Sequence, residues 1–377
     1  MPCDLKVFCD ILDETADEQI GVLAQQPAFD GCKVRIMPDA HAGAGCVIGF
    51  TADLREKVVP NLVGVDIGCG MLCVKVKRFD SLEMFDCNAK AVPSGFNVHE
   101  QTREHEGWMF DDVRDIGLLC LDELRNVERL TLSMGTLGGG NHFIEVDEDE
   151  EGGWYIVIHT GSRNLGLQVA NIYQRIAEET CKGGVPKGLE YLTGELAEAY
   201  LHDMRICQKW AVRNRDMIFN RLIGHNLYEG EKWAHPYMCI EEDGFTTAHN
   251  YIGDDGIIRK GAISAKEGEK VLIPLNMRDG SIIGIGKGNP DWNNSAPHGA
   301  GRVMSRGEAR RRLDVDEFKR QMEGIYTTTA NAETIDEAPD AYKPASAILA
   351  ALKPTVEVVH RLRPVYNFKA AENRRRR

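Results

Sequence analysis

Four glycine-rich segments that carry histidine, cysteine or aspartate are spread along this chain from its first quarter to its last. They are Val63–Met71, Gly138–His142, His159–Arg163 and His298–Arg302. Side chains so far apart in sequence can serve one site only if the fold assembles them from distant segments. The sequence therefore favours a single α/β domain with one composite site over a string of independent modules.

The first segment places a carboxylate and a thiol three residues apart, at Asp66 and Cys69, among apolar residues and glycines. A free carboxylate in such surroundings is strongly destabilising unless a partner neutralises it. A metal ion is the simplest partner, because it stabilises a thiolate and a carboxylate side by side. Cys69 by itself fits a small buried hydrophobic residue better, but next to Asp66 it indicates a metal site.

The second and third segments contribute histidines with little value for core packing. The glycines before His142 let backbone N–H groups approach an anion closely, with a plain turn as the alternative. His159 is expected at the end of a buried strand, where α/β proteins commonly display ligands and catalytic groups. The residues after it, up to Arg163, resemble an anion-binding turn at the start of a helix.

His298 differs from the other histidines because Gly299 and Gly301 leave its imidazole open to a large ligand. Arg302 and Arg306 follow closely enough to balance phosphate charge. Histidine is a competent nucleophile towards a phosphoanhydride when a metal neutralises the attacked group. Together the four segments indicate a metal-dependent enzyme that acts on phosphates.

The remaining histidines are less informative. His249, considered alone, fits a structural histidine with satisfied hydrogen bonds. Surface or packing roles are expected for six others, which are His99, His105, His202, His225, His235 and His360.

Composition restricts the class of protein further. The 377 residues include no apolar run of 18 or more and begin without a secretory leader, so neither a transmembrane helix nor export is expected. Eleven cysteines form no CxxC pair, which indicates reduced thiols in a cytoplasmic protein. A net charge of −13 disfavours general attraction to nucleic acid but leaves room for a local basic groove. A basic tail at 371–377 is expected to be frayed and solvated.

Apolar spacing gives the expected secondary structure. Strands are predicted at 154–158, 270–274 and 356–362. Helices are predicted at 15–26, 108–132, 164–182, 194–222, 306–323 and 345–352.

Seven motifs also resemble, in order, those of the RtcB family of RNA ligases, and several of them are individually rare. The resemblance runs from about residue 33 to Lys369 and implies one large RtcB-type domain at 1–370, of α/β (α+β) class, with a mixed central sheet and flanking helices. The motifs are Met37–His41, Val63–Met71, Gly135–Glu145, His159–Arg163, Arg259–Ala262, His298–Arg306 and Ala341–Lys343.

The resemblance implies a GTP- and Mn²⁺-dependent ligase that joins RNA 3′-phosphate or 2′,3′-cyclic phosphate ends to 5′-hydroxyl ends, in RNA repair or splicing. Cys69 would bridge two Mn²⁺ ions. Asp66 and His142 would complete one metal site, and His159 and His249 the other. His298 would form the histidine–GMP intermediate.

The same resemblance implies a nucleotide site and RNA contacts. Tyr342 would stack on the guanine, and Arg163 and Arg306 would bind RNA phosphate. GTP would be held by Asn141, His142, Glu145, His249, Asn250, Pro274, Met277, Ser281, His298, Gly299, Ala300, Gly301, Tyr342 and Lys369.

Three departures from the family pattern mark a divergent branch. Where the family usually has a Pro-Gly-Ser-Met-Gly loop, Pro274–Arg278 of this chain is Pro-Leu-Asn-Met-Arg. The usual Lys-Gly end is replaced by Lys369–Ala370, and Met37–Gly45 lacks the lysine that the family usually has in this motif. None of them changes a metal ligand or His298. A phosphotransferase or phosphatase without ligation, and a non-catalytic GTP- or RNA-binding protein, remain the alternatives. The natural RNA, an activating protein partner and the oligomeric state stay open.

Overall fold

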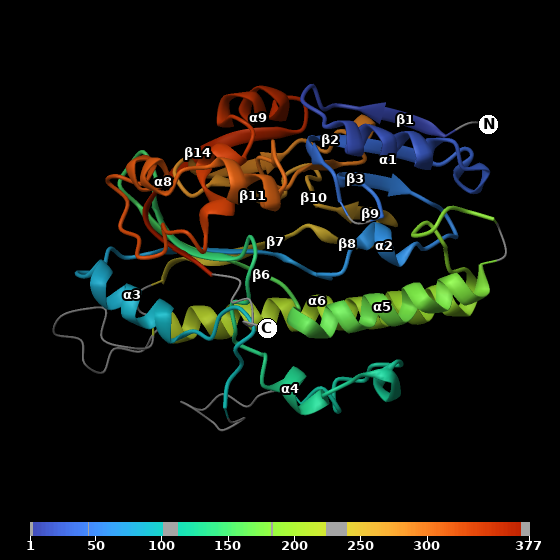
Figure 1. Cartoon of the computed structure of the whole chain (residues 1–377), viewed down its shortest axis with the longest axis horizontal. Helices are drawn as coiled ribbons and strands as arrows, with labels where there is room; N and C mark the ends of the chain where they lie inside the picture. Colours follow the sequence, from blue (N-terminus) through green and yellow to red (C-terminus); the bar gives the residue numbers. More distant parts are fainter. Residues whose placement is uncertain (1–2, 44, 101–111, 182–183, 224–239, 371–377) are drawn as a thin grey trace.

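Two β-sheets and a two-stranded ribbon carry the fold in the computed structural model (Figure 1). The structure describes residues 3–43, 45–100, 112–181, 184–223 and 240–370. The basic tail and three of the histidines assigned surface or packing roles, His105, His225 and His235, lie outside these residues. Within them, no helix is long and apolar enough to cross a membrane.

The larger sheet has seven strands, and every neighbouring pair is antiparallel. The sheet curls until its two edge strands meet: Leu272 N on one edge strand donates a hydrogen bond to Thr247 Oγ1 on the other across 3.1 Å. Its concave side encloses a small apolar core that includes Met71, Cys73 and Val157. In spatial order the strands are β11 (Lys270–Asn276), β12 (Gly280–Gly286), β14 (Val356–Lys369), β5 (Phe143–Glu148), β6 (Trp154–Thr160), β4 (Gly70–Val76) and β7 (Ile240–Ala248).

The smaller sheet has five strands and is mixed, because β1 and β2 are parallel and the other pairs are antiparallel. His249 is the single residue between β7 of the large sheet and β8 of this one, so the two sheets meet at a predicted site residue. The strands are, in order, β1 (Asp4–Val7), β2 (Lys33–His41), β3 (Ile48–Asp53), β9 (Ile257–Lys260) and β8 (Asn250–Ile252); β10 (Ala262–Ser264) and β13 (Ser295–Pro297) form the ribbon.

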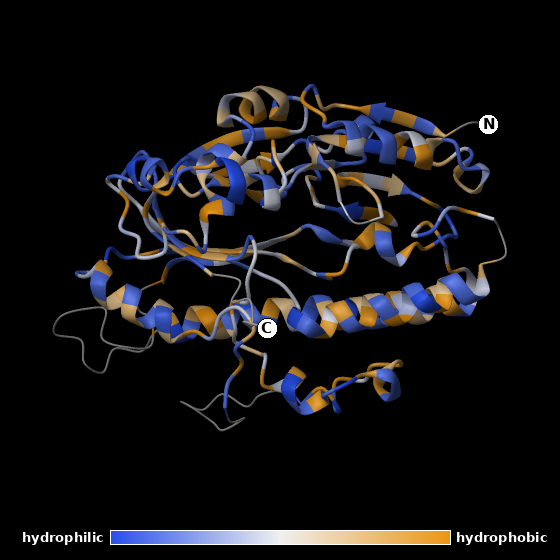
Figure 2. Ribbon diagram, in the orientation of Figure 1, coloured by the Kyte–Doolittle hydropathy of each residue, from blue (hydrophilic) through white to orange (hydrophobic). Residues whose placement is uncertain are grey.

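Two long helices, α5 (Arg163–Thr180) and α6 (Gly194–Ile223), run together beneath the strands in Figure 1. Both alternate polar and apolar residues along their length (Figure 2). The apolar side of α6, with Met204 and Trp210, joins the main hydrophobic core, as expected for an amphipathic helix on a sheet. The shorter helices are α1 (Glu14–Ala24), α2 (Pro60–Val63), α3 (Leu82–Ala91), α4 (Val127–Thr131), α7 (Arg306–Arg312), α8 (Val315–Gln321) and α9 (Ala345–Leu352).

The predicted α+β domain with a mixed sheet and flanking helices is confirmed, as are the three predicted strands and four of the helices. The helix predicted at 108–132 is wrong in its described part, which contains only a 3₁₀ turn, Leu121–Glu123, and α4. The buried Asp203 carboxylate accepts hydrogen bonds from the backbone N–H groups of Leu119 and Cys120 at 2.8 and 3.0 Å. These bonds hold the segment in an irregular conformation that propensity alone does not reveal.

The helix predicted at 306–323 is two helices, α7 and α8. Leu313 is extended between them, and the Asp314 side chain accepts hydrogen bonds from the N–H groups of Asp316 and Glu317. An aspartate that caps a new helix stabilises the break.

Candidate active site

The five predicted metal ligands converge where the two sheets meet. Asp66 and Cys69 lie in the turn that leads into β4, His142 precedes β5, His159 is near the end of β6 and His249 follows β7. Their ligand atoms form two groups of three that share Cys69: one with Asp66 and His142, the other with His159 and His249. Atoms within each group lie within 4.8 Å of one another, so the cluster could hold a metal ion.

Short distances connect the two groups. Cys69 Sγ lies 3.4 Å from Nε2 of both His142 and His159. His142 Nε2 is 3.0 Å from Asp66 Oδ2, and His159 Nε2 is 3.1 Å from His249 Nε2.

The orientation of the imidazoles explains why a cation fits. His142 Nδ1 lies 2.9 Å from the Leu137 carbonyl oxygen and His159 Nδ1 lies 3.2 Å from that of Asn141. Donation of each Nδ1–H to its carbonyl leaves the Nε2 lone pairs directed into the cluster. There they face a carboxylate oxygen and another imidazole, and Asp66 Oδ1 has no partner among the described residues. Acceptors that face one another in a buried site need a cation between them.

Burial controls the protonation of the cluster. It lowers the pKa values of His142, His159 and His249, which favours the neutral form that a metal requires. Burial and the Asp66 carboxylate raise the pKa of the Cys69 thiol. Burial also raises the pKa of Asp66, but the neighbouring His142 outweighs it, so this pKa lies below its usual range.

Two glycines leave room for the ligands and for the arginine behind them. A Cβ on Gly161 would lie 2.2 Å from Asp66 Oδ1, so any larger residue would displace that carboxylate. A Cβ on Gly138, whose φ is +78°, would lie 1.8 Å from the Arg163 guanidinium. This guanidinium packs behind His142, with its Nη1 3.2 Å from His142 Nδ1. Both glycines permit close approaches that other residues would block.

His298 lies beside the cluster and is held by Asp39 on β2. Its Nδ1 is 2.7 Å from Asp39 Oδ2, and its backbone N–H donates to the same oxygen at 3.1 Å. The His298 and His249 rings are 4.7 Å apart. With Nδ1–H donated to the carboxylate, Nε2 of His298 carries the free lone pair that a nucleophile needs.

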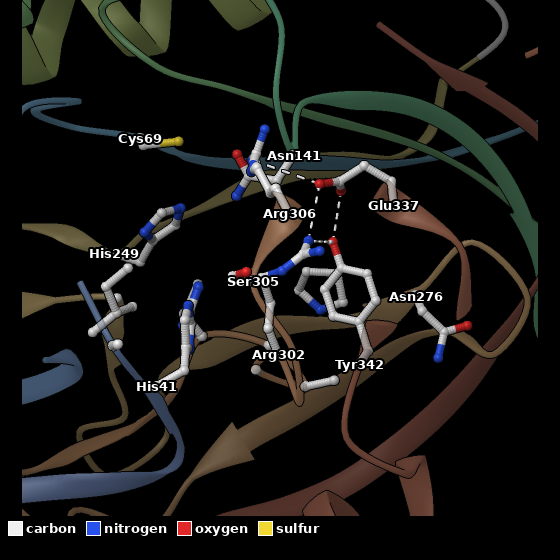
Figure 3. A pocket seen from close by; sticks show the side chains of 18 of the residues that line it. His41, Cys69, Asn141, His249, Asn276, Arg302, Ser305, Arg306, Glu337 and Tyr342 are labelled. Atoms are coloured by element: carbon white, nitrogen blue, oxygen red, sulfur yellow. Dashed lines mark hydrogen bonds and ion pairs between the residues drawn. The ribbon is translucent and has the colours of Figure 1, made fainter. Parts of the chain in front are cut away.

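A cavity of about 920 Å³ contains this histidine and part of the cluster. Figure 3 shows His41, His249 and Cys69 on one side of the cavity, with Glu337, Tyr342 and Asn276 on the other. A volume near the upper end of the range for small-molecule sites can hold a nucleotide.

A buried charged group forms the second side of the cavity. Glu337 accepts hydrogen bonds from Tyr342 OH at 2.6 Å and Arg302 Nη1 at 3.1 Å. Arg306 and Lys369 are further ion-pair partners at 3.6 and 3.1 Å. Burial raises the pKa of Glu337, but these cations outweigh it and set the pKa at about 2.

Most residues predicted to hold a nucleotide line the cavity, and so does Arg306. Two do not: His142 belongs to the metal cluster, and Ser281 is buried in β12. Arg163, predicted to bind RNA phosphate, lies behind His142 and not on the cavity wall. The lining residues of the predicted set are Asn141, Glu145, His249, Asn250, Pro274, Met277, His298, Gly299, Ala300, Gly301, Tyr342 and Lys369.

A model of the family described as tRNA-splicing ligase RtcB matches residues 19–370 of the sequence. The chain belongs to the RtcB family. RNA-splicing ligase RtcB of Escherichia coli K12 is 30% identical over 388 residues, covering 94% of each protein. tRNA-splicing ligase RtcB of Thermococcus kodakarensis is 29% identical over 427 residues, covering 91% of this chain and 86% of that protein. The protein from Aeropyrum pernix is 29% identical over 401 residues, covering 82% and 81%. The family predicted from the motifs is confirmed.

The departures from the RtcB pattern at the end of β11 and in the turn that follows it have a structural explanation. Asn276 Oδ1 accepts hydrogen bonds from the N–H groups of Arg278 and Asp279 at 3.0 and 2.9 Å, which closes the turn to β12. Leu275 packs in the cluster that includes Ala300 and Tyr342. The bulkier residues therefore stabilise the turn and its packing, while both still line the cavity.

Sequence reasoning missed three residues of this RtcB family member. Asp39 and His41 were noted only within a family motif, and Glu337 was not singled out. Asp39 and His298 are 259 positions apart, so no local pattern links them. The available signal was Pro38 directly before Asp39, with His41 and two glycines shortly after it; Glu337 offered none.

Proposed function

We propose that this chain is a GTP- and Mn²⁺-dependent RNA ligase that joins RNA 3′-phosphate or 2′,3′-cyclic phosphate ends to 5′-hydroxyl ends, in RNA repair or splicing. The observation that carries the proposal is the position of His298, whose Nδ1 is held 2.7 Å from Asp39 and whose ring adjoins that of His249. The proposed nucleophile thus lies beside candidate metal ligands in a cavity large enough for a nucleotide. Family membership supports an RNA substrate, since the relatives are named RNA-splicing or tRNA-splicing ligases.

Two metal ions would share the Cys69 thiolate, one with Asp66 and His142 and the other with His159 and His249. Carboxylate and imidazole ligands suit Mn²⁺, although a bridging thiolate is softer than that ion prefers. When bound, such a pair of ions neutralises charge on the attacking and leaving oxygens of a phosphoryl displacement.

His298 Nε2 would attack the α-phosphorus of GTP, forming an N–P bond as the bond to pyrophosphate breaks. No proton has to leave the attacking nitrogen, because Nδ1 carries the only ring proton. Asp39 keeps the ring in this tautomer and stabilises the positive charge that develops on it. The product is a histidine–GMP phosphoramidate.

The nucleotide would extend from His298 towards the group around Glu337. Tyr342 offers a ring for the guanine, and Lys369 and Asn141 lie at the same end, with Lys369 Nζ 3.1 Å from the Asn141 carbonyl oxygen. Pro274, Met277 and the Gly299–Gly301 backbone line the intervening wall.

The guanylyl group would next pass to an RNA 3′-phosphate, giving a diphosphate-linked RNA–guanosine. A 5′-hydroxyl would then displace GMP and form a 3′,5′-phosphodiester. Arg306, at the cavity wall, is the proposed contact to RNA phosphate.

The deciding experiment offers two RNAs in the presence of GTP and Mn²⁺. One has 3′-phosphate and 5′-hydroxyl ends, and the other has 3′-hydroxyl and 5′-phosphate ends. Joining of the first alone is expected. Joining of only the second would refute the polarity, and release of inorganic phosphate without joining would identify a phosphatase.

A further inference from the structure

Asp39 orients two imidazoles. Its side-chain Oδ2 accepts from His298 Nδ1 at 2.7 Å, and its backbone carbonyl oxygen lies 3.0 Å from His41 Nδ1. Donation of His41 Nδ1–H to that carbonyl places the lone pair of His41 on Nε2. The residue that holds the nucleophile therefore also fixes the tautomer of a second histidine.

His41 lines the cavity from the same side as His249 and Cys69 (Figure 3). Among the described residues no group forms a hydrogen bond with its Nε2. Burial lowers the pKa of His41 to about 4, with His298, Asp39 and Lys343 as its charged or titratable neighbours. The imidazole is thus neutral near pH 7, and its basic nitrogen is unoccupied.

Three of the other bases that line the cavity are engaged. Glu337 is bound by Arg302, Tyr342 and Lys369. Glu145 accepts a hydrogen bond of 2.5 Å from the Asn367 amide, and Asp66 belongs to the metal cluster.

The backbone that carries His41 is firmly held. The buried Lys343 Nζ donates to the carbonyl oxygens of Pro38 and Ala40 at 3.1 and 2.7 Å. These carbonyls flank Asp39 on either side, so the end of β2 that carries Asp39 and His41 is fixed. A general base has to be positioned in this way to act on one hydroxyl.

We propose that His41 is the general base that deprotonates the RNA 5′-hydroxyl in the sealing step. This role rests on the proposed function. The 5′-oxygen forms a bond to the phosphorus of the RNA 3′-phosphate, the phosphoanhydride bond to GMP breaks with its electron pair on GMP, and the hydroxyl proton moves to His41 Nε2. The guanylylation of His298 needs no such base, because its Nε2 carries no proton.

Two substitutions distinguish the loss of the basic nitrogen from the loss of the hydrogen bond to the Asp39 carbonyl. His41→Asn keeps an amide N–H near the position of Nδ1, where it can still donate to Asp39, and removes the basic nitrogen. His41→Gln places an amide near the position of Nε2. His360→Asn on β14 is the matched control, since that histidine pairs with Glu150 away from the cavity.

The steps are measured separately with radiolabelled GTP, a 3′-phosphate RNA and then a 5′-hydroxyl RNA, all with Mn²⁺. In both His41 variants sealing should slow about 100-fold or more relative to guanylylation, so the diphosphate-linked RNA–guanosine accumulates. His360→Asn should match the parent at each step. Sealing within threefold of the parent in both variants, or an equal fall in guanylylation and sealing, would overturn the role of His41. Absence of a protein–GMP adduct in the parent would instead overturn the proposed function, and this role with it.

Discussion

Lys369 on the last strand and Glu337 in the 3₁₀ turn Ile335–Glu337 form an ion pair across 3.1 Å, and both side chains are buried. Arg302, Arg306 and Tyr342 are further partners of the same carboxylate. A buried charge remains stable only while its partners stay in place. This pair therefore connects the stability of the fold to the shape of the cavity.

Glu337 should make the stability of the protein depend on acid pH. Its folded pKa of about 2 lies below the ordinary glutamate value of 4.5, so its contribution is present above about pH 4.5 and is lost as pH falls towards 2. The full contribution is about 3 kcal/mol, of which about 1 kcal/mol should be lost by pH 3.5. Urea unfolding of the parent and Glu337→Gln from pH 6 to pH 3.5 measures it.

The difference in unfolding free energy between the two proteins should shrink over that range. Glu333→Gln, an exposed glutamate just before the same turn, is the control and should show a constant difference. A constant difference for Glu337→Gln as well would contradict a depressed pKa in the folded state.

Cys69 should determine whether metal ions bind at all. Cys69→Ala removes the atom common to both ligand groups, so both sites should weaken, whereas His249→Ala should weaken mainly one. The matched control is Cys73→Ala, which alters a buried cysteine within the apolar core on β4, the strand that begins directly after Cys69. Metal content after dialysis against Mn²⁺ measures the effect, and two ions retained by Cys69→Ala would contradict the bridge.

Metal binding by the parent should also release protons. Burial holds the pKa of the Cys69 thiol well above its ordinary value, and only the thiolate binds a metal. Calorimetric titration in two buffers of different ionisation enthalpy measures the release. Cys69→Ala should show less release per ion.

His298→Ala should abolish protein labelling by radiolabelled GTP and leave the metal content nearly unchanged. The ring belongs to neither ligand group, and its Nδ1 is bound to Asp39. The adduct of the parent should be labile in acid and stable in base, as a phosphoramidate is. Undiminished labelling of His298→Ala would move the nucleophile to another residue.

The extent to which this site could be predicted depended on how local each signal was. Asp66, Cys69, His142, His159 and His298 each stand in a glycine-rich segment, and the glycines matter structurally: a Cβ on Gly161 would overlap Asp66. The structure brings these residues together, as the composite site requires. His249 had no such local signal, and only the family resemblance placed it with the others.

The features that the sequence could not predict depend on contacts between residues that lie far apart in the sequence. Asp39, on β2 of the smaller sheet, contacts His298, which directly follows β13 of the ribbon. The segment at 112–126 is irregular because Asp203 on α6 accepts hydrogen bonds from two of its backbone amides. The sequence pattern of the segment itself gives no indication of that contact. Tertiary contacts of this kind override local propensity.

Arg306 should contribute to RNA affinity as a phosphate contact. Its side chain lies at the cavity wall, 3.6 Å from Glu337 and about one-third exposed, so a phosphate can reach it. Arg306→Gln should weaken binding of RNAs of different sequence by similar factors. It should also reduce the slope of log K against log salt by about one.

Arg363→Gln, which removes an exposed arginine paired with Glu148, should leave the slope unchanged. Fluorescence anisotropy of 3′-phosphate RNA between about 50 and 200 mM salt provides both slopes. An unchanged slope for Arg306→Gln would exclude a direct phosphate contact, since a neutralised phosphate releases its counterion whatever the RNA sequence.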